Sequence, residues 1–268
     1  MTEKIISKIC FFFVFLFLYT PIMIVMIFAF NTTKSKIVFS GFTLKWFFEL
    51  FKDKAVLCAF FNSLTLGIVS CILSTIIGTL ASLHITKFKK EKQYFFTNLN
   101  YIPIINSDVI TGISLMLILK FILNIVNGEF GFFTVLISHI TISMPYVVLT
   151  ILPKIKSIDP NILDAALDLG CSPLVTLFKV TIPNIAPYLA SALIMAFSVS
   201  FDDFTVSYFT TGASFQTLPV LIYSMVRRRI TPKINALFTL VFILALSILI
   251  FINILNFNGK NSNKKFSQ

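Results

Sequence analysis

The sequence is poor in charged residues and lacks the short motifs of soluble enzymes. Only 12% of its 268 residues are Asp, Glu, Lys or Arg, whereas water-soluble domains carry about 25%. No P-loop, dinucleotide-binding glycine motif or HExxH zinc motif is present. The four scattered cysteines form no CxxC pair, which argues against a zinc site and a disulfide framework. We therefore expect no catalytic residue, no metal ligand and no cofactor bound by this chain.

Strand-like alternation of polar and apolar residues is also missing, which argues against a membrane β-barrel. Hydrophobic residues instead make up 57% of the chain. They recur in runs of roughly 20 residues, the length a helix needs to cross about 30 Å of hydrocarbon. The pattern predicts an all-α integral membrane protein with six transmembrane helices, at about 8–30, 56–84, 95–120, 132–152, 184–209 and 235–256.

The amino-terminal apolar run resembles a signal peptide in its position only. Lys4 and Lys8 precede an apolar stretch from Ile9 to Phe30. That stretch is longer than the 7–15 residues typical of a signal sequence, and no A-x-A cleavage site follows it. We interpret it as a retained first transmembrane helix.

The net charge of +11 indicates basic loops beside anionic lipid headgroups rather than nucleic-acid binding. Lysine and arginine divide almost evenly between the two sides of the predicted bundle. The cluster KFKKEK (87–92) favours a cytoplasmic amino terminus, whereas the arginine triplet 227–229 opposes it. Charge alone leaves the orientation open.

Small residues line one face of the second predicted span at intervals of three or four. Such a stripe lets a second helix approach closely in lipid. Packing within this chain and an interface with another subunit explain it equally well. The stripe consists of Ser63, Gly67, Ser70, Ser74, Gly78 and Ser82.

One polar segment, DPNILDAALDLGCSPLVTLFKVTIP (159–183), interrupts the apolar chain between two spans. Asp159-Pro160 and Ser172-Pro173 are helix-start signals, because Asp and Ser cap helices and proline fits the first turn. Gly170 is a helix-end signal, and Ile182-Pro183 is expected to end the second helix. Two short helices with apolar stripes need a covering surface, and the acidic ridge formed by Asp164 and Asp168 disfavours anionic lipid. We therefore expect a protein partner.

The same segment resembles the EAA motif of permease subunits of bacterial ABC importers. That pattern is roughly E-A-A-x-x-x-G followed by I-x-L-P. Aspartate replaces the usual glutamate here, and the ending is shortened. In that family the motif forms a coupling helix that docks on a cytoplasmic ATPase. The resemblance therefore implies ATPase-coupling roles for Asp164, Ala165, Ala166, Gly170, Ile182 and Pro183.

Further stretches resemble the spermidine/putrescine (PotC-type) importer permeases: FTLKWFFELF (42–51), NSDVITGISLMLIL (106–119), FDDFTVSYFTTG (201–212) and TLPVLIYSMVRRRITPKINAL (217–237). The resemblance implies a type I ABC importer permease fold, with 1–268 as a single transmembrane domain and 153–183 as its coupling loop. It also implies a multi-pass protein of the bacterial inner membrane with a cytoplasmic amino terminus.

The implied partners are a similar permease subunit in a heterodimer, a cytoplasmic ATPase dimer that binds ATP and Mg²⁺, an external polyamine-binding protein and membrane lipid. Nucleic acid is not among them. The external segments 31–55 and 210–234 are expected to meet the binding protein.

Three acidic residues, Asp108, Asp202 and Asp203, fall within the predicted spans. Each costs about 2.5–3.5 kcal/mol at a helix centre, so intramembrane acids indicate function by default. Carboxylates spaced along a path suit a polycationic substrate. The alternative is structural: Asp202 bonds a neighbouring helix, and Asp108 marks a break in the third span. Trp46 is either an interfacial anchor or a cation–π contact for a passing amine, and we include it in the predicted substrate pathway.

Three other interpretations stay open at this point. The importer could carry another small solute. A secondary transporter could use Asp202 and Asp203 for proton coupling without any ATPase. A membrane enzyme with a metal on the paired aspartates is disfavoured, because no further acidic or histidine cluster lies nearby in the sequence.

Overall fold

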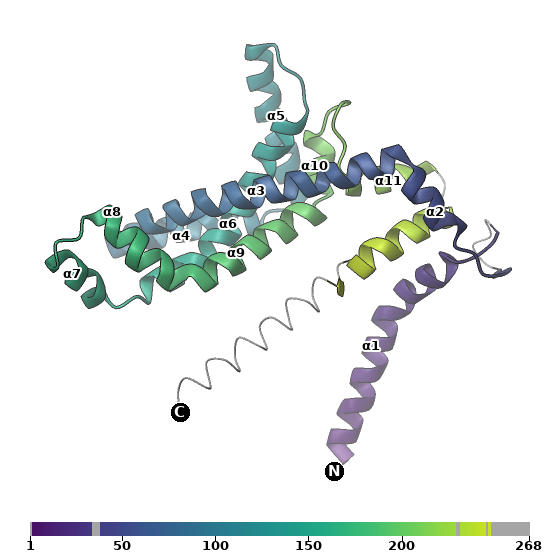
Figure 1. The fold of residues 1–268 in the computed structure, drawn as a ribbon, viewed down its shortest axis with the longest axis horizontal. Helices are drawn as coiled ribbons and strands as arrows, with labels where there is room; N and C mark the ends of the chain where they lie inside the picture. Colours follow the sequence, from purple (N-terminus) through teal and green to yellow (C-terminus); the bar gives the residue numbers. More distant parts are fainter. Residues whose placement is uncertain (1, 34–37, 229–230, 245, 248–268) are drawn as a thin grey trace. The chain divides into compact units, whose positions relative to one another are not determined.

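A computed structural model of the chain describes residues 2–33, 38–228, 231–244 and 246–247 (Figure 1). Within those ranges the regular structure is helical, and the one β-bridge joins Asn31 to Phe42. The prediction of an all-α membrane protein is confirmed. The helices are α1 (Thr2–Phe28), α2 (Lys45–Lys52), α3 (Lys54–Thr86), α4 (Lys90–Ile105), α5 (Asp108–Val126), α6 (Phe132–Lys156), α7 (Pro160–Asp168), α8 (Pro173–Thr176), the π-helical η1 (Leu177–Thr181), α9 (Ile182–Asp202), α10 (Thr205–Thr210) and α11 (Leu218–Arg228).

Five helical segments of the described chain are long and apolar enough to cross a membrane. The sixth predicted span, 235–256, begins within an apolar helix over Pro232–Leu244, and most of its remainder lies outside the described residues. The helix count therefore agrees with the prediction as far as the structure describes it. The five segments are Cys10–Phe28, Lys54–Thr86, Asp108–Val126, Phe132–Lys156 and Pro173–Asp202.

The chain divides into two compact units, 1–57 with 222–268 and 58–221. The smaller unit contains α1 and α2, and the larger unit contains most of α3 and the helices α4 to α10. The prediction of one permease domain over 1–268 concerns the assembled molecule and stays a prediction.

The predicted third span, 95–120, is wrong as a single helix. The structure divides it into α4 and α5, with extended backbone at Ser107 and Asn106 between them. The Asn106 side chain donates to Thr111 Oγ1 at 3.3 Å, which supports the turn. The sequence alternative that Asp108 follows a break is therefore confirmed, and Asp108 occupies the first turn of α5 rather than a helix centre.

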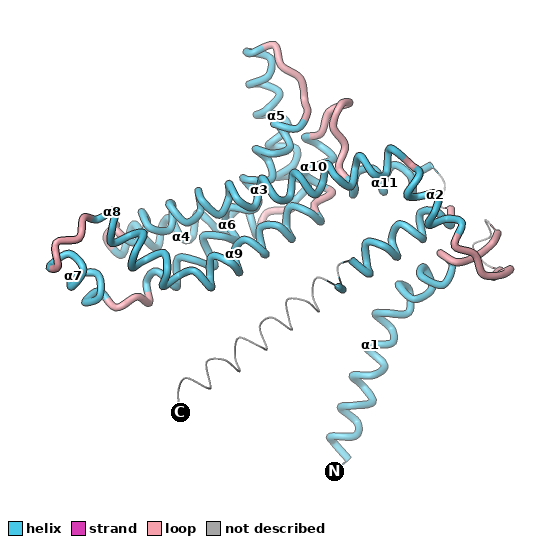
Figure 2. The backbone as a smooth tube through the Cα atoms, in the orientation of Figure 1, coloured by secondary structure: helices cyan, strands magenta, loops and turns pink. Residues whose placement is uncertain are grey.

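The predicted fifth span, 184–209, is also displaced. Helical structure runs from Pro173 through η1 and α9 to Asp202, then breaks and resumes as α10 (Figure 2). We expected Pro183 to end a helix, but it lies inside the continuous helical stretch Pro173–Asp202. Proline lacks an N–H and its ring collides with the carbonyl four residues earlier. The preceding turn is π-helical, with Ile182 N–H donating to Leu177 O, and this wider turn accommodates the proline.

The larger unit has its core between α3, α6 and α9. The small-residue stripe of α3 lies inside this core, with Ser63, Ser70, Ser74 and Ser82 buried. A Cβ added to Gly67 would lie 2.9 Å from the ring of Phe197, and one added to Gly78 would lie 2.7 Å from Val147. The stripe therefore packs within this chain, which decides the alternative that the sequence left open.

The smaller unit is tied by polar contacts between its loops and helices. The indole Nε1 of Trp46 donates to Asn31 O at 2.7 Å. Lys233 donates to the Asp53 carboxylate, and this ammonium holds the pKa of Asp53 below its usual value. The first contact holds the segment after α1 against α2, and the second joins the end of α2 to the helix over Pro232–Leu244.

Candidate functional site

The coupling loop, residues 153–183, forms two short helical segments joined by a sharp turn. Asp159 accepts a hydrogen bond from Asn161 N at 3.0 Å, and Pro160 occupies the first turn of α7. Ser172 accepts one from Val175 N at 3.4 Å, and Pro173 begins α8. Both helix starts follow from local capping chemistry, as the sequence predicted.

Gly170 ends α7 in a left-handed conformation, with φ at +82°. Two hydrogen bonds of a Schellman motif form around it: Gly170 N donates to Leu167 O at 2.9 Å, and Cys171 N donates to Ala166 O at 3.1 Å. An added Cβ would meet no atom of this chain within 4 Å. The glycine is therefore required within the chain by its backbone angle and not by lack of space.

The helices α7 and α8 of the coupling loop lie beyond one end of the α3, α6 and α9 bundle (Figure 1). Leu169, Leu174 and Phe178 are 86%, 68% and 65% exposed, respectively. Asp164 and Ala165 of the EAA-like motif are exposed, whereas Ala166 is buried. The loop therefore presents an apolar surface with a carboxylate beside it, which suits a protein partner.

The loop connects differently to its two flanking spans. A turn through Ser157 and Ile158 separates α6 from α7. On the other side α8, η1 and α9 continue without a loop, and Ile182 and Pro183 lie inside that continuous helical stretch. A displacement of α8 therefore passes directly into α9, while α7 is joined to α6 through a turn.

Besides the coupling loop, a cluster of polar side chains forms where α9 breaks, away from the coupling-loop end of the bundle. Asp203 follows the last residue of α9 in an extended conformation. Its two carboxylate oxygens accept hydrogen bonds from Val206 N at 3.2 Å and Ser207 N at 2.7 Å. The side chain thus satisfies N–H groups in the first turn of α10. Asp202 and Asp203 lie at a helix end, so the expectation that they sit mid-helix is wrong.

His139 of α6 is the centre of this cluster and received no role from the sequence. Its side chain is fully buried. Nδ1 lies 2.7 Å from Ser200 Oγ, Nε2 lies 2.8 Å from Ser207 Oγ, and Nε2 is 3.5 Å from Asp203 Oδ2. Ser70 of α3 extends the chain of contacts, with its Oγ 2.8 Å from Ser200 Oγ. Four helices, α3, α6, α9 and α10, therefore meet through polar side chains.

A signal for this cluster was present in the sequence. Ser200, Asp203 and Ser207 recur at intervals of three and four, and His139 is a polar residue in the middle of an apolar span. A polar group in hydrocarbon needs a partner. What the sequence did not contain was which of several polar residues that partner would be.

We predict that His139→Leu lowers the stability of the folded chain by about 1–2 kcal/mol, because the Ser200 and Ser207 hydroxyls both lose their hydrogen bonds to the buried imidazole. The melting temperature of the purified protein should fall by roughly 2–6 °C. His84→Leu is the matched control, since His84 is exposed at the end of α3. Equal melting temperatures for both variants would contradict a structural role for His139.

The other two acids differ from Asp203 in their surroundings. Asp202 is exposed, and no hydrogen bond or ion pair found among the described residues involves its carboxylate. Asp108 is exposed in the first turn of α5, and α5 packs against α10. Gly112 permits this packing, because a Cβ there would lie 2.9 Å from Phe209 of α10. The helix that begins with Asp108 is therefore a neighbour of the helix that follows Asp202 and Asp203.

Trp46 belongs to the smaller unit. Its side chain is buried, with 6% exposed, and its N–H is bonded to the Asn31 carbonyl. Lys45 Nζ lies 5.9 Å from the centre of its ring. The role of Trp46 in a substrate pathway stays a prediction.

Comparison with known proteins gives a consistent result. Residues 74–265 match the family model described as the binding-protein-dependent transport system inner membrane component. The chain is 35% identical over 237 residues to the spermidine/putrescine transport system permease protein PotC of Escherichia coli K12, covering 88% of each chain. It is 34% identical over 230 residues to the putrescine transport system permease protein PotI of the same strain, covering 85% of this chain and 82% of that protein.

Two solved structures share the fold. A crystal structure of a bacterial ABC transporter involved in the import of the acidic polysaccharide alginate superposes with a TM-score of 0.73 at 19% identity, covering 95% of this chain and 93% of that chain. The bacterial alginate ABC transporter in complex with its pentasaccharide-bound periplasmic protein gives 0.69 at 20% identity, covering 93% and 91%. At this identity the likeness concerns architecture alone.

Proposed function

Because this chain belongs to the family of binding-protein-dependent transport system inner membrane components, we propose that it is the permease subunit of an ATP-driven importer for spermidine or putrescine. The observation that carries the substrate class is the 35% identity to PotC over 88% of both chains. The acids at the start of α5 and the end of α9, Asp108, Asp202 and Asp203, supply a physical reason. Protonated amines need several weak anionic positions that are favourable enough to enter and weak enough to leave.

The ATP chemistry belongs to separate subunits in this proposal. A cytoplasmic ATPase dimer holds ATP and Mg²⁺ and grips the coupling loop through Leu169, Leu174 and Phe178, with Asp164 paired to a basic group. The exposure of these apolar side chains supports a protein contact. Closure of the ATPase pulls α8, and the continuous helix carries the displacement into α9.

The coupling loop is then connected to Asp202 and Asp203 by α9 itself. Its first residue, Ile182, follows η1, and its last, Asp202, is one of the three acids. The His139 cluster ties the same end of α9 to α6. In this proposal, movement of the coupling loop shifts the backbone around Asp202 and Asp203, and the importer alternates between two arrangements of α9, as coupling between distant sites requires.

The assembly we propose contains a second, similar permease, two ATPase subunits and an external binding protein that meets segments 31–55 and 210–234. The chain is oriented with its amino terminus and coupling loop in the cytoplasm of a bacterium, in the inner membrane.

The test is uptake of labelled spermidine and putrescine into proteoliposomes that contain the complete complex. We expect uptake only with the binding protein outside and with ATP on the ATPase side. Uptake by the permease without its ATPase, abolished by an uncoupler, would contradict the proposal and favour proton coupling. ATP-dependent uptake of a different solute, with polyamines inactive, would overturn the substrate assignment alone.

A further inference from the structure

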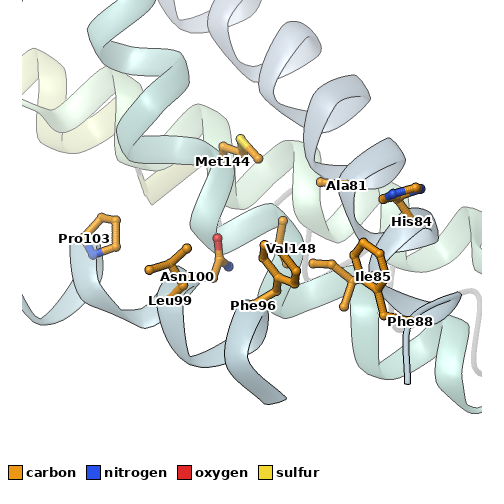
Figure 3. A pocket seen from close by; sticks show the side chains of 10 residues that line it. All are labelled: Ala81, His84, Ile85, Phe88, Phe96, Leu99, Asn100, Pro103, Met144 and Val148. Carbon is orange, nitrogen blue, oxygen red and sulfur yellow. The ribbon is translucent and has the colours of Figure 1, made fainter. Parts of the chain in front are cut away.

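An apolar cavity of about 370 Å³ lies between α3, α4 and α6 in the larger unit. Figure 3 shows Phe96, Leu99, Asn100 and Pro103 of α4 facing residues of α3 and α6 across this space. The lining residues of those two helices are Ala81, His84, Ile85, Phe88, Met144 and Val148, where Phe88 follows the end of α3. No residue of the coupling loop lines this cavity, and neither do Asp108, Asp202 and Asp203.

The cavity offers little to a polar ligand. The Asn100 amide is engaged, since its Nδ2 donates to Pro145 O at 3.1 Å. Gln93, at the start of α4, donates to the carbonyls of Thr86 and Phe88. At one end Phe88 stacks on Phe96, with ring centroids 5.3 Å apart, and meets the His84 ring edge to face at 4.9 Å. An apolar chain therefore suits this space better than a hydrogen-bonding solute does.

The α4 stripe that lines the cavity begins with lysines. Lys89 and Lys92 precede Phe96, Leu99 and Pro103 at intervals of three or four, so they continue the same helical face. Lys87 and Lys90 lie beside them, and all four are exposed. None of these lysines takes part in an ion pair found among the described residues. The cavity is thus lined by mainly apolar side chains, and exposed lysines precede its lining residues at the start of α4.

We propose that this cavity is a binding site for an anionic phospholipid, with an acyl chain along α4 and the headgroup phosphate on Lys89 and Lys92. The amphiphilic pattern of the site matches the amphiphilic pattern of such a lipid. Basic pockets between transmembrane helices on the cytoplasmic side bind anionic headgroups in the same way.

The basic end lies at the end of the larger unit where the coupling loop also lies, because α3 ends and α4 begins there (Figure 1). The assignment to the cytoplasmic leaflet rests on the proposed function. The lipid-binding site itself does not rest on the proposed function, since it depends only on the cavity and on the lysines at the start of α4.

The experiment measures quenching of a reporter tryptophan by brominated lipids in mixed bilayers, with the full chain alone and in the assembled importer. Leu99→Trp places the reporter in the cavity. Ile102→Trp places it on another face of α4, which is 59% exposed, and serves as the matched control. The parent chain, which contains Trp46, gives the background.

At the Leu99→Trp reporter we expect brominated phosphatidylglycerol to be preferred over brominated phosphatidylcholine by about fivefold, falling toward one in 1 M NaCl. At the Ile102→Trp reporter the ratio should be near one. Adding Lys89→Gln with Lys92→Gln should abolish the preference, whereas Lys179→Gln, which removes an exposed lysine of the coupling loop, should leave it.

Equal ratios at the two reporters would mean ordinary annular lipid and would overturn the proposal. Loss of all quenching at Leu99→Trp in the assembled importer would mean that a protein covers the cavity, and would overturn it equally. Because the readout is lipid binding and not uptake, its failure is distinguishable from failure of the transport assignment.

Discussion

Gly170→Val is expected to remove most ATP-driven uptake while leaving the chain inserted and assembled. The native φ of +82° is a left-handed conformation that a β-branched residue disfavours. The strain is roughly 1–2 kcal/mol, which would lower the population of correctly shaped coupling loops by about 5–30-fold. Uptake by reconstituted complexes, normalised to the amount of permease, measures the effect.

Gly170→Asn is the matched variant, because asparagine tolerates the left-handed region far better than valine does. Around Gly170 this chain leaves space for a side chain. Retained uptake with asparagine would therefore assign the requirement to backbone angle. Loss of uptake with both variants would place the surface of the ATPase against Gly170. Normal uptake with Gly170→Val would refute the role of the α7 turn in coupling.

Asp202→Asn is expected to raise the apparent KM for polyamine about tenfold or more without changing stability. Its carboxylate is exposed and has no partner found among the described residues. Removing one charge from a contact with an ammonium costs about 1.5–3 kcal/mol. The concentration dependence of spermidine uptake and the melting temperature, measured on the same preparation, separate the two properties.

Asp203 should respond differently from its neighbour. Its oxygens accept the N–H groups of Val206 and Ser207, so Asp203→Ala is expected to cost about 0.5–2 kcal/mol of stability through the lost cap. Asp203→Asn keeps one capping oxygen and should cost less. Glu91→Gln, which removes a carboxylate near the coupling-loop end, is the control for net charge.

An unchanged apparent KM for polyamine in Asp202→Asn would remove Asp202 from the proposed substrate pathway.

The adjacent aspartates thus illustrate how local pattern and tertiary structure divide the information. The sequence marked both as intramembrane acids within one predicted span, 184–209. The helix in fact ends at Asp202, and Asp203 caps the next one. The two aspartates therefore have different surroundings: Asp202 is exposed, and Asp203 is nearly buried beside His139.

The sequence by itself determined the class of protein and the local shape of the coupling loop. Spans follow from apolar length, and the starts of α7 and α8 and the turn at Gly170 follow from Asp-Pro, Ser-Pro and glycine, whose effects act within a few residues. The orientation of the protein and its substrate class were inferred from its resemblance to importer permeases. The ATPase-coupling roles of the EAA-like residues remain proposals.

Only the tertiary structure decided which polar groups meet. Ser70 reaches Ser200 and His139 reaches Ser207, across separations of 130 and 68 residues, and Gly112 of α5 packs against Phe209 of α10. It also decided that the α3 stripe packs within the chain and that Pro183 continues a helix through a π-helical turn. Periodicity specifies which face a residue occupies, but the identity of the residue opposite depends on how helices are docked. That docking is set by the packing of the whole bundle.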